Sequence, residues 1–304
     1  MNDRRQLELY GRTDVGCVRT GNEDGFLLQI AGKPMPSLNA VPKEGVLGPA
    51  EVIAAVSDGM GGAAAGEVAS RTALVTLSRY LEERNPSLTQ GDCSAKVRLV
   101  EAAVHLANQA VIEKGREMGI KKTMGATITA ALFAGDALYL FQVGDSRAYV
   151  MRAGCLAPVT RDQSFVGHLV AMGTITEEQA LKHPQRNVIL QALGTQDHLK
   201  VDVSYLPLCR GDLVLLCSDG LYSEFEPDAL NELVNQSAAL PLPELVNRLV
   251  DTAVESGGKD NITVLGIRAQ AGFPPREPGE NPRFLPFPFL DLDNPFKKSD
   301  NLFR

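Results

Sequence analysis

Short apolar runs along this chain end at acidic residues. Val52–Val56 leads into a Ser-Asp-Gly sequence that contains Asp58, and Leu213–Cys217 leads into a second one that contains Asp219. Runs of this length are typical of buried strands, and a carboxylate at the end of such a strand costs free energy unless a positive charge meets it. Two more acidic residues border predicted strands: Asp145 follows Leu138–Val143, and Asp260 precedes Ile262–Arg268.

Longer stretches show the apolar spacing of amphipathic helices. Ala63–Glu83 and Ser94–Met118 carry apolar residues at helical intervals, which predicts two helices packed on a sheet. Pro227–Val234 and Leu242–Ser256 predict a second pair of helices. The remaining predicted strands are Leu7–Thr13, Phe26–Ile30, Gly125–Phe133, Ala137–Val143, Arg147–Arg152, Leu199–Leu206 and Asp212–Cys217.

The order of these elements predicts the fold class. The strands form two clusters, each followed by helices, without the strand–helix alternation of parallel sheets. Gly125–Phe133, Ala137–Val143 and Arg147–Arg152 are linked by short Gly-Asp turns, which predicts an antiparallel meander. We therefore expect an α+β protein whose residues 1–270 form one domain, an antiparallel sandwich with helices on its outer faces.

Three segments differ from this pattern. Prolines and glycines in about residues 31–50 predict an extended loop insertion, and residues 160–194, which lack a continuous core face, predict a partly mobile helical flap. Residues 271–304 hold seven of the 18 prolines and six of the 11 phenylalanines, so this tail cannot build a core of its own. It is either disordered or docks its phenylalanines on the domain or on a partner.

Composition narrows the functional classes. The 304 residues carry a net charge of −7 without a basic stripe, which argues against a nucleic-acid-binding protein. The five cysteines are scattered without a CxxC pair, as expected for reduced thiols rather than disulfides or a zinc site. No signal sequence or long apolar run is present, so we expect a cytoplasmic protein that does not associate with membranes.

The acidic residues at the strand ends suggest a site for divalent metal ions. Mg²⁺ and Mn²⁺ prefer oxygen ligands, and a pair of such ions promotes in-line displacement at phosphorus. Asp58 is suited to bridge two ions because it ends a rigid strand, and the carbonyl of Gly59 can add a ligand. Asp219 and Asp260 would come from the partner edge, and a metal-activated water would attack the phosphoryl group.

The N-terminal loop offers a group for the substrate phosphate. Arg19 lies just before Asn22, Glu23 and Asp24, and a guanidinium can bind two phosphate oxygens at once. Asp24 could hold a metal-coordinated water. The plainer alternative is that Arg19 is a surface arginine paired with Glu23 or Asp24.

Eight short motifs occur in one order along about residues 7–269, and this order makes the set specific although each motif alone is weak. The motifs are GxxRxxNED at Gly16–Asp24, SDGMGG at Ser57–Gly62, GEVAS at Gly66–Ser70, MGAT at Met124–Thr127, GDSRAY at Gly144–Tyr149, HPQRN at His183–Asn187, SDGL at Ser218–Leu221 and DNITV at Asp260–Val264. On these motifs the sequence resembles the metal-dependent serine/threonine phosphatases of the PP2C (PPM) family in their bacterial form.

The resemblance implies a four-layer αββα sandwich of two antiparallel β-sheets flanked by helix pairs. It also implies removal of phosphate from phosphoserine and phosphothreonine in proteins that a Ser/Thr kinase has modified. Asp58 would bridge two core Mg²⁺ or Mn²⁺ ions, the Gly59 carbonyl would bind the first, and Asp219 and Asp260 would bind the second. We expect the protein to act as a monomer.

The same resemblance assigns the remaining polar residues. Asp24 would hold metal-coordinated waters, and Asp145 with Asp219 would bind a possible third ion near the flap. Arg19 would bind the substrate phosphate.

One position departs from the animal members of the family, where a histidine after the Asp-Gly pair is taken as the general acid. Here that position is Met60, which cannot donate a proton. We hypothesise that a metal-coordinated water or His183 of the flap protonates the leaving group; the plainer alternative is that His183 is a surface histidine.

Two other functions compete with this prediction. A catalytically silent pseudophosphatase that binds phosphoproteins would be expected to lack Asp58, Asp219 or Asp260, and all three are present. A phosphatase dedicated to regulators of the anti-sigma-antagonist type usually carries sensor domains, and the sequence shows none.

Overall fold

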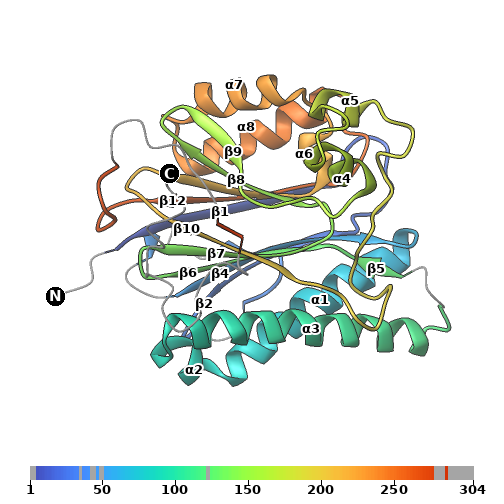
Figure 1. Ribbon diagram of the computed structural model, residues 1–304, viewed down its shortest axis with the longest axis horizontal. Helices are drawn as coiled ribbons and strands as arrows, with labels where there is room; N and C mark the ends of the chain where they lie inside the picture. Colours follow the sequence, from blue (N-terminus) through green and yellow to red (C-terminus); the bar gives the residue numbers. More distant parts are fainter. Residues whose placement is uncertain are drawn as a thin grey trace.

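The computed structural model describes residues 5–33, 36–41, 46–47, 51–120, 124–276 and 285–286. Two antiparallel sheets lie face to face, and helices cover the outer face of each, so four layers are stacked (Figure 1). This arrangement confirms the α+β sandwich expected from the sequence. Within the described residues, no helix is both long and apolar enough to cross a membrane.

The first sheet carries the helix pair α7 (Pro227–Ser237) and α8 (Leu242–Glu255) on its outer face (Figure 1). Its strand order is β3-β1-β12-β11-β8-β9. The strands are β1 (Leu7–Asp14), β3 (Val46–Leu47), β8 (Arg147–Arg152), β9 (Cys155–Pro158), β11 (Leu213–Cys217) and β12 (Ile262–Ala269).

The second sheet is covered by α1 (Ala63–Glu83), α2 (Asn85–Gln90) and α3 (Cys93–Glu117) (Figure 1). Its order is β13-β10-β7-β6-β4-β2, and the short β5 pairs with the end of β4. The strands are β2 (Asp24–Ile30), β4 (Val52–Met60), β5 (Gly125–Ala126), β6 (Ile128–Ala134), β7 (Ala137–Val143), β10 (Asp202–Pro207) and β13 (Leu285–Pro286).

A buried apolar layer joins the two sheets. Phe26, Leu140, Leu216 and Leu265 are each at most 1% exposed and belong to one cluster between the sheets. Because β4, β6 and β7 also pack against helices on their other face, their sequences are continuously apolar instead of alternating. Burial on both faces is the reason that these strands could be identified from the sequence.

The predicted meander is wrong at its third strand. β6 and β7 form the expected antiparallel hairpin, but β8 pairs with β9 and β11 in the other sheet. The chain leaves β7 at Gly144, whose φ of 103° lies in a region that favours glycine. A Cβ at this position would lie 2.7 Å from the Thr127 side chain, so the turn between the sheets is closely packed.

Predicted strand boundaries also change, as they do around β4 and β5. β4 does not end at Val56 but continues through Asp58 to Met60, because β5 supplies a pairing partner for Gly59 and Met60. The predicted strand Gly125–Phe133 is correspondingly interrupted at Thr127, where the chain passes from β5 to β6.

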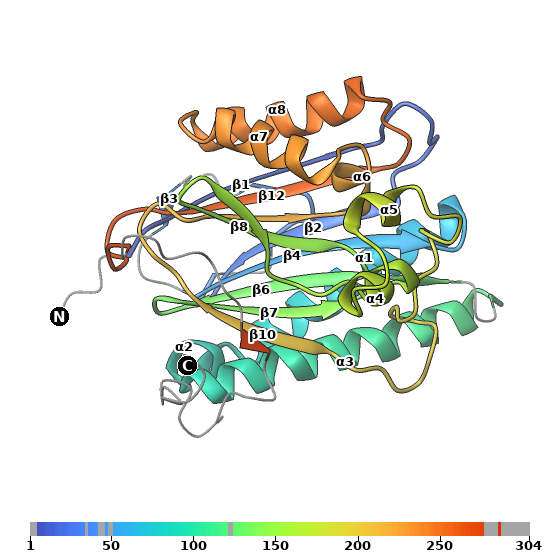
Figure 2. The same ribbon diagram turned by 45° about the horizontal axis from the view of Figure 1, so that its top comes forward.

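The structure describes the whole flap, but only parts of the loop insertion and of the tail. The flap contains the short helices α4 (Phe165–Ala171) and α5 (Glu177–Leu181), which lie beside α6 (Asp219–Tyr222) (Figure 2). Part of the predicted loop insertion at 31–50 and most of the tail at 271–304 lie outside the described residues. Within the tail, Phe273 is buried against the core between the sheets, and β13 pairs with β10.

Candidate metal centre

Asp24 and Asp58 face each other across neighbouring strands. Asp24 begins β2 and stands opposite Asp58 of β4 in the antiparallel register. Two like charges placed directly opposite on a sheet are destabilising, so this pairing requires a compensating positive charge. Hydrogen bonds hold the pair in place: Ser218 donates to Asp24 Oδ2 over 2.7 Å, and the Asp58 backbone N–H donates to Thr127 Oγ1 over 2.9 Å.

Asp145, Asp219 and Asp260 approach the same place from other elements. Asp145 follows β7 at the crossing between the sheets, Asp219 is the first residue of α6, and Asp260 directly precedes β12. The charges of all three raise the pKa of Asp58, after burial and the charge of Asp24. After burial and the charge of Asp260, an interaction with the Asp58 carboxyl also affects the pKa of Asp219, so these two groups are neighbours. The structure therefore brings together the five aspartates that the sequence singled out.

The environment of these aspartates disfavours their charged form. Burial raises the pKa of Asp24 to about 7, and burial followed by the charge of Asp219 raises the pKa of Asp145 to about 8. Burial and then the charge of Asp260 raise the pKa of Asp219 to about 6. Asp24 and Asp145 are buried, whereas Asp58 and Asp219 lie deep but keep some contact with solvent.

The donor set suits a hard divalent cation. Asp24 Oδ1 and Asp219 Oδ1 are buried without a hydrogen-bond partner among the described residues, so these carboxylate oxygens have unused acceptor capacity. In the same part of the chain, no three acidic, histidine or cysteine side chains stand close enough together to enclose one cation by themselves. A cation here would complete its shell with backbone carbonyls and water, as Mg²⁺ commonly does.

Gly59 permits a close approach between β4 and the start of α1. A Cβ on Gly59 would lie 2.0 Å from the carbonyl oxygen of Gly66, and a Cβ on Gly66 would overlap the Glu23 carboxylate. The Gly59 N–H also donates to the Glu23 carbonyl over 3.1 Å. The two glycines in the SDGMGG and GEVAS motifs are thus explained by packing beside the aspartates.

Arg19 is paired with Asp260 and not with the alternatives expected from the sequence. One terminal nitrogen of its guanidinium donates to Asp260 Oδ2 over 2.7 Å, and the side chains of Arg19 and Asp260 are 49% and 35% exposed. This hydrogen bond is the main cause of a raised Arg19 pKa. Arg19 therefore lies beside the aspartates, on the solvent side of the centre.

The centre is held in position by several residues to which the sequence analysis gave no role. Asn261 accepts from the Glu23 N–H over 2.8 Å and donates to the carbonyls of Val15 and Gly21, which fixes the loop that carries Arg19. The Thr127 hydroxyl is also bonded to the Ser146 hydroxyl over 2.7 Å. Both residues belong to motifs recognised in the sequence, MGAT and DNITV, and those motifs were the available signal.

His183 lies on the flap, after helix α5. Its Nδ1 accepts a hydrogen bond from the Gln185 N–H over 3.1 Å, and its ring is 5.9 Å from the ring of Phe165. It is not among the residues that line the cavity beside the centre. The geometry gives little support to its proposed role as general acid.

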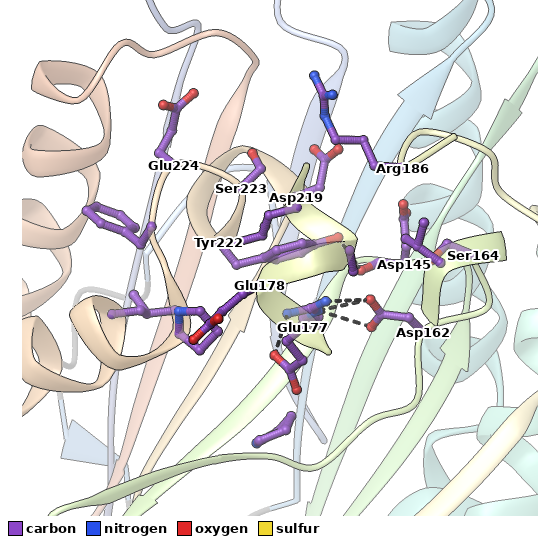
Figure 3. A pocket seen from close by; sticks show the side chains of 18 of the residues that line it. Asp145, Asp162, Ser164, Glu177, Glu178, Arg186, Asp219, Tyr222, Ser223 and Glu224 are labelled. Atoms are coloured by element: carbon purple, nitrogen blue, oxygen red, sulfur yellow. Dashed lines mark hydrogen bonds and ion pairs between the residues drawn. The ribbon is translucent and has the colours of Figure 1, made fainter. Parts of the chain in front are cut away.

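A cavity of about 1030 Å³ opens from the centre toward the flap. Asp145, Asp219, Asp260 and Arg19 line one part of it. Figure 3 shows Asp145 and Asp219 near Tyr222, whose hydroxyl donates to the Asp145 carbonyl over 3.0 Å. The carboxylates therefore face a space large enough for a substrate.

Comparison with known proteins decides the family. A model described as Protein phosphatase 2C matches residues 45–260. This chain belongs to the protein phosphatase 2C family. The resemblance inferred from eight motifs is thereby confirmed.

Relatives in this family are bacterial serine/threonine phosphatases. The chain is 37% identical over 262 residues to the serine/threonine protein phosphatase PstP of Mycobacterium tuberculosis, an alignment that covers 85% of this chain and 44% of PstP. It is 34% identical over 254 residues to the serine/threonine phosphatase stp of Listeria monocytogenes, covering 84% of this chain and 92% of stp. The chain therefore spans less than half of one relative and nearly all of the other.

A solved structure of the family supports both the fold and the type of cofactor. The catalytic domain of PstP, solved in complex with two manganese ions, superposes with a TM-score of 0.68 at 32% identity and covers 88% of this chain and 99% of that chain. The family relationship thus agrees with the carboxylate-rich donor set described above.

Proposed function

We propose that this protein removes phosphate from phosphoserine and phosphothreonine in proteins, at a centre of two Mg²⁺ or Mn²⁺ ions. One observation supports this most strongly: five aspartates from both sheets converge beside an open cavity, and two of their buried oxygens lack hydrogen-bond partners among the described residues. Cations would stabilise the charged form of these carboxylates, and the family to which the chain belongs contains phosphatases.

The ligands proposed from the sequence are retained. Asp58 would bridge the two ions, the Gly59 carbonyl would bind the first, and Asp219 and Asp260 would bind the second. Asp24 would orient coordinated water, and Asp145 would join Asp219 at a possible third ion. When bound, such ions lower the pKa of coordinated water and offset charge on the phosphoryl oxygens.

Arg19 is proposed to bind the substrate phosphate. In this structure the guanidinium forms an ion pair with Asp260. Because both side chains are partly exposed, this ion pair contributes little to the stability of the fold. When the Asp260 charge is offset by a cation, the guanidinium becomes available to two phosphate oxygens. The ion pair with Asp260 would keep Arg19 beside the centre until the substrate arrives.

The test is a metal-titrated assay on two substrates, an aryl phosphate and a phosphothreonine peptide. We expect hydrolysis of both with Mn²⁺ and none with chelator, and a loss of at least about 10²-fold in Asp58→Asn. The pseudophosphatase alternative predicts instead that the peptide binds without turnover and that Asp58→Asn makes no difference.

Three further expectations belong to the same proposal. The substrates would be targets of a Ser/Thr protein kinase, the protein would act in the cytoplasm, and it would act as a monomer. Dephosphorylation of kinase-modified proteins in a lysate, cell fractionation and sedimentation of the purified chain test these expectations in turn.

A further inference from the structure

The cavity beside the metal centre extends well beyond the space that a phosphoryl group needs. From Asp219 and Asp260 it continues under the flap to strand β9 and the start of α7. Figure 3 shows the flap residues Glu177 and Glu178 in the cavity, whereas Asp162 lies beside Asp145, nearer the metal centre. The cavity thus has a reacting end and a far end formed by different elements.

Apolar side chains form much of the far end. Leu156 of β9, Leu181 of α5 and Phe225 before α7 line it and are only half-buried, and Leu230 of α7 lies behind them at 4% exposure. These side chains come from three separate elements and leave apolar surface facing the cavity. An apolar group that entered the cavity would remove that surface from water, which is favourable.

The flap is anchored at its base and closed by a weak contact at its outer edge. At the base, Arg147 makes a bidentate ion pair with Asp162, over 2.7 Å at its closest, and its guanidinium stacks on Tyr222 at 3.8 Å. At the outer edge, Lys182 pairs with Glu226 over 2.9 Å, with side chains 74% and 48% exposed. An ion pair this exposed contributes little to holding α5 beside α7.

We propose that the far end of this cavity binds an apolar side chain of the phosphoprotein substrate, at a position next to the phosphorylated residue. The proposal rests on the proposed phosphatase function, because the occupant is identified by the continuity of this space with the reacting end. Substrates would therefore be phosphoserine or phosphothreonine sites flanked by Leu, Ile, Met or Phe.

The test uses phosphothreonine peptides with a single leucine moved through the flanking positions of a Gly/Ser background. At one position we expect kcat/KM to exceed that of the all-Gly/Ser peptide by about tenfold or more, the discrimination that an apolar pocket provides for a few methylene groups. Equal rates for all peptides would overturn the proposal.

Variants then locate the effect. Leu156→Ser and Leu181→Ser, which change lining residues from β9 and α5, should each abolish most of the increase in kcat/KM that leucine gives, while Leu156→Met should keep it. Leu190→Ser is the matched control, since Leu190 is a flap residue, is 51% exposed and does not line the cavity. If leucine still increases kcat/KM in both cavity variants, that result would contradict the proposed site.

Two readouts separate this proposal from the phosphatase function itself. Hydrolysis of a small aryl phosphate should be unchanged in all of these variants, because that substrate does not reach the far end. Anisotropy of a labelled leucine peptide that carries a non-hydrolysable phosphonate, measured with Mn²⁺, should show weaker binding in Leu181→Ser than in Leu190→Ser. Failure of aryl phosphate hydrolysis in the unmodified protein would refute the enzyme proposal, whereas equal peptide binding would refute only this site.

Discussion

At the scale of single residues, the centre is defined by carboxylates whose surroundings oppose their charge. Asp24 and Asp58 face each other across a strand pair, and Asp219 reaches the same point from the other sheet. A protein stabilises such a group either by binding protons or by binding cations. Stability without metal should therefore depend on pH in a defined direction.

The raised pKa values give that direction. Asp24 and Asp219, with pKa values of about 7 and about 6 when folded against 3.8 ordinarily, bind protons more tightly in the folded state. Their stabilising contribution is complete below about pH 4 and is lost as pH rises through the folded pKa values, since the unfolded chain then binds fewer protons. In chelator, the melting temperature should fall between pH 5 and pH 8.

Metal should reverse this trend. Because Mn²⁺ binds the deprotonated carboxylates, the rise in melting temperature on adding Mn²⁺ should be larger at pH 8 than at pH 5. Thermal unfolding at both pH values, with and without chelator, measures the effect. An equal rise at both pH values would show that these carboxylates do not bind the ion.

His183 provides a second prediction at this scale. Since it does not line the cavity and its Nδ1 already accepts a hydrogen bond, we expect His183→Ala to change kcat on a phosphothreonine peptide by less than about the 10²-fold typical of a general acid. The alkoxide of threonine is a poor leaving group, so this substrate is the sensitive one. A larger loss, absent with an aryl phosphate, would restore His183 as the acid.

At the scale of elements, local pattern predicted most strands and helices but not their partners. α1 was predicted at its observed bounds from helical spacing, and β7 from its continuous apolar run. The sequence did not predict that β8 lies in the other sheet, because the pairing of strands depends on contacts between residues that are distant in sequence. α6 was missed because a four-residue helix has too few positions for a periodic pattern.

A buried ion pair links elements of the first sheet and gives a further prediction. Arg152 of β8 donates to Asp212 over 2.9 and 2.6 Å, and both side chains are at most 2% exposed. Arg152→Met would leave the Asp212 carboxylate buried without its cation, so we expect a loss of about 3–5 kcal/mol in the free energy of unfolding. Denaturant unfolding measures it.

An exposed pair serves as the matched control. Asp251 pairs with Arg12 at 2.7 Å but is 57% exposed, so Asp251→Ala should cost less than about 1 kcal/mol. Similar losses in Arg152→Met and Asp251→Ala would contradict the importance given to burial.

At the scale of the whole molecule, the site could be predicted because both sheets bring strand ends to one edge. Apolar runs in the sequence precede Asp58, Asp145 and Asp219, and another run follows Asp260. These four positions converge once the two sheets stack. The partner of Arg19 and the cavity under the flap could not be predicted, because they depend on how loops from distant parts of the chain pack together.

The central claim is that these aspartates form a centre for two divalent ions, and calorimetric titration of Mn²⁺ into the metal-free protein tests it most directly. We predict at least two ions bound per chain, and loss of most of this binding in Asp58→Asn, with Asp251→Asn unchanged as a control for surface carboxylates. No binding, or identical binding in Asp58→Asn and the unmodified protein, would contradict it.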